Sequence, residues 1–145
     1  MRLAMLALLL APLSAWAAQP CAFEAPRQMQ LELAGVHAVT IEVNAYDLHL
    51  QGVAGATRLD LDGRACASDA KLLEQLVVTQ RRDGDRLVLT LGEERKGLFP
   101  FKLFGSSSAS LKVDVRLPRE LPVTVQVGSG DANVTTLDSL SAVVG

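Results

Sequence analysis

Alternation of apolar and polar residues, with a period of two, runs through most of this 145-residue sequence. It is clear at 29–33, where Met29, Leu31 and Leu33 alternate with polar residues. The pattern recurs at 39–43, 48–50, 59–62, 87–91, 111–117 and 123–127. Because successive side chains of a strand point to opposite faces, each segment predicts a half-buried β-strand. The sequence therefore predicts a mainly β fold.

Two shorter signals interrupt the strands. The segment 68–75, "SDAKLLEQ", predicts a short helix that Ser68 or Asp69 could cap, with Leu72, Leu73 and Leu76 on one face. Further on, Asp83-Gly84 separates two strand-like halves. Asp-Gly favours a two-residue hairpin, since a type I′ turn needs positive φ at both central positions. We expect antiparallel hairpins in the N-terminal part of the fold.

The segment 92–110 lacks the alternation and contains three of the four phenylalanines: Phe99, Phe101 and Phe104. One interpretation is a long hairpin loop whose aromatic rings fold back over the core, and we favour it. The other is an exposed apolar tip, flanked by Arg95, Lys96 and Lys102, that contacts a membrane or a partner.

A weak internal repeat lies near the C-terminus. "VQVGSGDANVTTLDS", starting at Val125, aligns with "IEVNAYDLHLQGVAG", starting at Ile41, so that Asp131 matches Asp47. "VQVG" at 125–128 also aligns with "AVVG" at 142–145, about 17 residues later. A repeat near 20 residues is typical of a β-solenoid, in which coils stack on one another.

The residues Gly128, Ser129, Gly130 and Asp131 predict the corner of such a coil. Both glycines can adopt the positive φ of a sharp bend, and both polar side chains can bond to nearby backbone N–H groups. We therefore expect the antiparallel N-terminal part to lead into a β-solenoid of which only the first coil is present. A solenoid needs several coils and a polar cap, so we also expect the chain to be incomplete at its C-terminus.

The first 17 residues have the features of a secretory signal peptide. Arg2 precedes an apolar run at 3–13, and Ala15-Trp16-Ala17 fits the cleavage rule. The run is too short to cross a bilayer, which needs roughly 20 residues. Pro20, directly before Cys21, argues against lipid attachment there. We expect cleavage after Ala17, a β-rich domain over 18–145, and a periplasmic or secreted protein.

The chain contains two cysteines, Cys21 and Cys66. In an exported protein an even number of cysteines predicts a disulfide. A metal pair or two free thiols are the alternatives, and neither His37 nor His49 has a ligand spacing to either cysteine. The formal net charge of −2, without a basic stripe, argues against nucleic-acid binding.

Several short motifs carry a resemblance to a known family. They are "VGSGD" at 127–131, its partial recurrence at Val144-Gly145, and more loosely Tyr46-Asp47-Leu48. Cys21, "YDLHLQGVAG" and "GRACASD" at 63–69 add to it. The sequence resembles the bacterial envelope proteins grouped as putative adhesins, exported domains of unknown function built from repeated VGSGD-type β-coils. The resemblance implies an adhesion-like role.

The motifs that suggest calcium binding or a serine nucleophile are each incomplete. Asp131 begins a stretch like an EF-hand loop, but Thr136 replaces the required glycine and Ala142 the bidentate glutamate. Ser129 lies in Gly-Ser-Gly, which is not the nucleophile elbow of hydrolases. We expect no catalytic residue, no metal and no cofactor.

Carboxylates are the remaining candidates for catalysis. Alternation places them on solvent faces, and the sequence shows no clustering of Asp60, Asp62, Asp114 and Asp131. We expect an exported non-enzymatic β-solenoid domain with a structural or adhesion-like role in the cell envelope. Its partner would be an envelope component or a surface ligand. The alternative is a secreted β-helix polysaccharide hydrolase or lyase, which needs two carboxylates across a groove.

Overall fold

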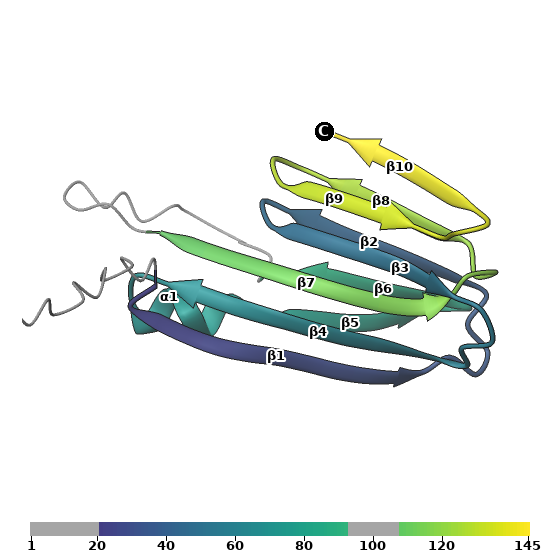
Figure 1. The fold of residues 1–145 in the computed structure, drawn as a ribbon, viewed down its shortest axis with the longest axis horizontal. Helices are drawn as coiled ribbons and strands as arrows, with labels where there is room; N and C mark the ends of the chain where they lie inside the picture. Colours follow the sequence, from purple (N-terminus) through teal and green to yellow (C-terminus); the bar gives the residue numbers. More distant parts are fainter. Residues whose placement is uncertain (1–20, 93–107) are drawn as a thin grey trace, which may run out of the picture.

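Two five-stranded β-sheets face each other in the computed structural model, which describes residues 21–92 and 108–145 (Figure 1). Sheet 1 has the strand order β1-β4-β7-β3-β9, and sheet 2 has the order β10-β8-β2-β6-β5. The elements are β1 (Phe23–Glu32), β2 (Ala38–Asn44), β3 (Asp47–Val53), β4 (Arg58–Ala67), α1 (Ala70–Gln75), β5 (Val78–Asp83), β6 (Arg86–Leu91), β7 (Ala109–Pro118), β8 (Val123–Val127), β9 (Asp131–Thr135) and β10 (Leu140–Val144). The prediction of a mainly β chain is confirmed. The predicted signal peptide and Phe99, Phe101 and Phe104 lie outside the described residues.

Parallel and antiparallel pairing occur in both sheets. β4 pairs antiparallel with β1 and with β7, and β5 pairs antiparallel with β6. β3 runs parallel to β7 and β9, while β2 runs parallel to β6 and β8, and β10 runs parallel to β8. The antiparallel strands β1, β4 and β5 therefore gather at one end of the two sheets, and the parallel strands occupy the rest (Figure 1).

Successive strands form levels, each with one strand in either sheet. β2 and β3 form one level, β6 and β7 a second, and β8 and β9 a third. The β2/β3 level lies between the other two, so the order of the levels is not the order of the chain. The expectation that parallel stacking starts only near the C-terminus is wrong, because it already includes β2 and β3. The sheets are mixed and remain open at their edges.

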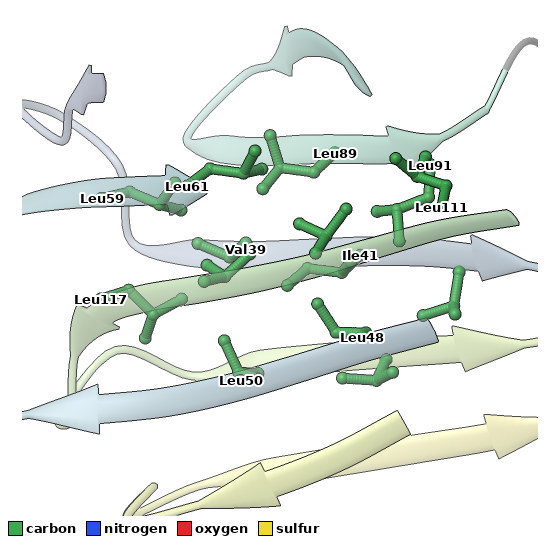
Figure 2. Close-up of a cluster of buried hydrophobic side chains, with 14 of the residues drawn as sticks. Val39, Ile41, Leu48, Leu50, Leu59, Leu61, Leu89, Leu91, Leu111 and Leu117 are labelled. Carbon is green, nitrogen blue, oxygen red and sulfur yellow. The ribbon is translucent and has the colours of Figure 1, made fainter. Parts of the chain in front are cut away.

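The apolar faces of the two sheets meet in a continuous core (Figure 2). Ile41 and Leu89 from sheet 2 and Leu50 and Leu59 from sheet 1 are fully buried. Each such side chain stabilises the fold by about 1.5–3 kcal/mol relative to exposure. These residues are the apolar members of the alternating segments, so the alternation predicted the buried face of each strand correctly.

Helix α1 covers the end of the core next to β1 and β4 (Figure 1). Asp69 is its N-cap, and the Asp69 carboxylate accepts a 2.8 Å hydrogen bond from the Leu72 amide. The Arg27 guanidinium of β1 donates to the carbonyls of Leu73 (2.9 Å) and Leu76 (2.7 Å). The predicted helix is confirmed, with Asp69 as its cap. Within residues 21–92 and 108–145, no helix is long and apolar enough to span a membrane.

The predicted hairpin joins β5 and β6, but its turn is shifted by one residue. Asp83 pairs with Arg86, so the two central residues are Gly84 and Asp85. Only Gly84 has positive φ, at 63°. This is the φ pattern of a type II′ turn, which places glycine first, and the type I′ prediction is wrong.

The two side edges of the molecule differ. At the β1 and β5 edge, the Arg82 guanidinium donates to the carbonyls of Glu32 (2.7 Å) and Ala34 (2.9 Å), which ties sheet 2 to sheet 1. At the opposite edge β10 pairs with β8 alone among the described strands. Val143 and Val144 of β10 are exposed, at 55% and 76%.

Candidate functional site

The residues that align in the sequence lie side by side in the structure. Asp47 of β3 pairs with Asp131 of β9, and Ile41 of β2 pairs with Val125 of β8. Val125 in turn pairs with Ala142 of β10. The 17-residue offset between the aligned segments therefore corresponds to one step from strand to neighbouring parallel strand.

Backbone hydrogen bonds hold the β8–β9 corner against the β2–β3 corner. The Asn44 carbonyl accepts from the amides of Gly128 and Gly130, both at 3.1 Å, and the Tyr46 carbonyl accepts from Asp131 at 3.1 Å. The Asn44 side-chain amide donates to the Leu91 carbonyl of β6, at 2.9 Å. Asn44 thus connects three levels.

The glycines of this corner are needed for a reason other than the predicted one. Neither Gly128 nor Gly130 has positive φ, and Asn44 is the corner residue in that conformation, at 56°. A Cβ atom on Gly130 would overlap the Tyr46 carbonyl oxygen and lie 2.6 Å from the Tyr46 nitrogen. Gly130 therefore allows one corner to approach the backbone of the next.

The polar side chains of the corner do not act as predicted. Ser129 and Asp131 are exposed. Among the described residues, neither side chain makes a hydrogen bond to the backbone at this corner, and the corner bonds run between backbone groups and through Asn44. Tyr46 extends the contact toward β6, because a Cβ on Gly92 would overlap the Tyr46 ring.

The opposite ends of the strands have a similar stack. A Cβ on Gly52 of β3 would overlap the Thr136 carbonyl oxygen, and the Arg119 amide donates to the Val53 carbonyl at 3.2 Å. The Asp138 carboxylate accepts from the Arg119 guanidinium, at 2.9 Å from Nη2. This hydrogen bond, together with the charge of Asp138, raises the pKa of Arg119 above its usual value. Turns that follow β3, β7 and β9 are thereby linked.

The disulfide between Cys21 and Cys66 is present, with a Cα–Cα distance of 5.3 Å. It joins the residues that precede β1 to β4, the strand with which β1 pairs. The prediction of this disulfide is confirmed. Since β1 is the outermost strand of sheet 1, the bond anchors an edge strand.

The outer face of sheet 1 carries a shallow hollow of about 820 Å³, which is the best candidate for a ligand site. Its polar lining forms two rows across the strands, because residues in register lie opposite one another. One row contains Gln28, Asp62, Asp114 and His49. The other contains Gln30, Asp60, Arg116 and Gln51.

The expectation that the carboxylates do not cluster is wrong. Asp60, Asp62 and Asp114 line the same hollow, although they do lie on a solvent face as expected. Asp62 and Asp114 are direct cross-strand partners on β4 and β7. Asp131 lies outside this hollow, in register with Asp47.

Two of the carboxylates in the hollow have charged or ionisable neighbours. His49 Nδ1 lies 2.9 Å from Asp114 Oδ1, and Arg58 Nε lies 3.1 Å from Asp60 Oδ1. His37, which is not in the hollow, lies 3.3 Å from Asp85. In the described part of the chain, no group of three or more His, Cys, Asp or Glu side chains is arranged to hold a metal ion.

A second hollow of about 630 Å³ continues the first toward β9. It shares His49 and Asp114 with the first and adds Asp47, Lys112, Asp131 and Asn133. The two hollows together extend over all five strands of sheet 1. Sequence reasoning missed this surface, because alternation shows which side chains face solvent but not which strands are neighbours.

Comparisons with known proteins support the fold. No protein-family model matches the chain, and no curated protein matches it. A solved structure described as a "putative cell adhesion protein" from Clostridium sporogenes is similar, with a TM-score of 0.52 and 11% sequence identity. The match covers 85% of this chain but only 58% of that one, so this chain spans little more than half its length. A structure described as a "putative adhesin" from Bacteroides fragilis matches at a TM-score of 0.35 and 14% identity, over 85% of this chain and 56% of that one. This chain therefore shares its fold with the matched part of the Clostridium sporogenes protein.

Proposed function

We propose that this chain is an exported, non-enzymatic β domain with a structural or adhesion-like role in the bacterial cell envelope. The observation that carries the proposal is the in-register stacking of the β8/β9 level on the β2/β3 level, with Gly130 in contact with the Tyr46 backbone. Stacked levels build an elongated surface from a small repeating unit, as in solenoid proteins. We propose that the parallel strands are the beginning of such a solenoid.

Three further observations favour an extracytoplasmic role. The Cys21–Cys66 disulfide suits an oxidising compartment, because thiols of cytosolic proteins are normally kept reduced. The fold is shared with a protein named for cell adhesion. The apolar run before Ala17 supplies the signal that export requires.

A cell-based experiment tests this function. The gene is deleted in its bacterium, and the strain is compared with one that carries the gene on a plasmid. We expect the protein in the periplasmic or extracellular fraction with Ala18 as its first residue, and weaker attachment or a weaker envelope in the deletion strain. Cytoplasmic protein that retains Met1, or a deletion without either defect, would contradict the proposal.

A further inference from the structure

At the centre of the outer face of sheet 2, polar side chains of neighbouring strands bond to one another. On the outer face of sheet 2, Arg86 donates to Thr40 at 2.7 Å, and Thr90 donates to Glu42 at 2.9 Å. Thr40 and Thr90 are also buried, at 6% and 9% exposed. These four side chains of β2 and β6 thus satisfy one another across the strands, whereas Thr124 and Gln126 of β8 on the same face have no side-chain partner among the described residues.

On the outer face of sheet 1, several polar side chains that line a single hollow have no partner within the protein. Gln28, Gln30, Gln51, Asp62 and Arg116 line the 820 Å³ hollow and have no hydrogen-bond or ion-pair partner among the described residues. Amide, carboxylate and guanidinium groups together offer both donors and acceptors of hydrogen bonds. A ligand that lies here can bond to both kinds of group.

The pair Asp62–Asp114 adds a second argument. Like charges directly opposite on neighbouring strands destabilise a sheet, whereas opposite charges stabilise it. In the neighbouring row Arg116 lies opposite Asp60 in the strand register, so the sheet can accommodate opposite charges at such positions. Asp114 is neighboured by His49, while Asp62 has no partner in the described part of the chain. The arrangement is unfavourable for folding but suitable for a ligand that donates hydrogen bonds to Asp62.

The shape and charge of the surface select the ligand class. Neighbouring strands are about 4.8 Å apart, so a row across the four strands β1, β4, β7 and β3 extends for about 14 Å. With three carboxylates and one guanidinium, the hollow repels polyanions such as nucleic acids. Hydroxyl groups both donate and accept, so they can bond to the carboxylate, amide and guanidinium groups of the hollow. A long, uncharged or cationic polyhydroxylated chain fits these requirements.

We propose that the outer face of sheet 1 binds a neutral or amino-group-bearing glycan, which lies across β1, β4, β7 and β3. Asp62 and Asp114 accept hydrogen bonds from its hydroxyl groups, Arg116 donates to its oxygen atoms, and the glutamines do both. This inference rests on the proposed function, for which it supplies the ligand class.

The probes are chitohexaose, cellohexaose and, as the polyanion, hexagalacturonic acid, each at millimolar concentration. Binding to the chain without its first 17 residues is measured by NMR titration. We expect a neutral hexasaccharide to shift backbone and side-chain amide signals of the four strands and to leave sheet 2 unchanged. No shift with either neutral probe, shifts confined to other surfaces, tighter binding of the polyanion, or cleavage of a probe would each overturn the proposal.

Matched variants localise the site. Gln51→Ala on the outer face of sheet 1 should weaken binding several-fold, while Gln126→Ala on the outer face of sheet 2 should not change it. Asp62→Asn should weaken binding about tenfold, as for loss of a hydrogen bond to a charged group, without lowering the melting temperature. Equal affinity for Asp62→Asn, or a lowered melting temperature that accounts for the loss, would overturn the role of Asp62.

The same variants separate this inference from the proposed function. The deletion strain is complemented with Gln51→Ala or Asp62→Asn. If these variants fail to bind the glycan in vitro and fail to restore attachment, both proposals stand. If they restore attachment fully, the glycan site is overturned as the adhesive surface, while an envelope function remains.

Discussion

At the scale of single residues, the close approach of two backbones explains the glycine at position 130 better than a need for positive φ does. Gly130 does not need positive φ, and its lack of a side chain is what allows contact with Tyr46. Asn44 instead adopts the left-handed conformation, which Asn tolerates better than most residues. The corner could be located from the sequence, but the reason for its glycine could not. A close approach depends on a second segment, 84 positions away, whose position is unknown until the strands are paired.

We predict that Gly130→Ala destabilises the chain by about 1–3 kcal/mol, because its Cβ would force the β8–β9 corner away from Tyr46. Ser129→Ala is the matched control, since Ser129 is exposed, and should change stability by less than about 0.5 kcal/mol. Urea denaturation of the three proteins measures both effects. Equal stability of Gly130→Ala and the natural chain would show that the two corners are not in contact.

At the scale of elements, alternation predicted seven of the ten described strands but could not give their neighbours. β1 pairs with β4, and β2 pairs with β6 and β8, so most partners are distant in the chain. Alternation depends on one strand and one face, whereas pairing depends on the packing of all strands together. For the same reason, the sequence placed Asp62 and Asp114 on solvent faces but could not show that they lie opposite each other.

We predict that the Cys21–Cys66 disulfide stabilises the protein by about 2–4 kcal/mol. The cysteines are 45 positions apart, and the bond restricts the unfolded chain while it fixes the edge strand β1 against β4. Urea denaturation of the double variant Cys21→Ala, Cys66→Ala, compared with the oxidised protein, measures the difference. Two alkylatable thiols in native protein purified without reductant would show that the bond does not form.

At the scale of the whole molecule, the centre of sheet 2 and its β10 edge should differ in local stability. β2 has a hydrogen-bonded strand on each side and contributes fully buried residues to the core, whereas every residue of β10 is exposed. Local opening costs little where burial is low and backbone bonds face solvent. We therefore expect local opening to cost more free energy at the centre of the sheet than at the β10 edge.

We predict that amide hydrogen exchange of the 145-residue chain is slowest in β2 and fastest, among the described strands, in β10. Exchange measured by NMR or mass spectrometry gives the comparison, and β8 serves as an internal reference because it pairs on both sides. Protection of β10 equal to that of β2 would indicate that another chain or segment covers it.

The central position of the β2/β3 level also has a consequence for biosynthesis. Both neighbouring levels follow it in the chain, and Val123 of β8 comes 70 positions after Val53 of β3. At about 5–20 residues per second, a ribosome needs roughly 4–14 s for this interval. During that time β2 and β3 exist as nascent segments with exposed apolar faces and one edge without its partner. The topology therefore makes the chain dependent on protection, by a chaperone or by delayed folding, until the last strands have been made.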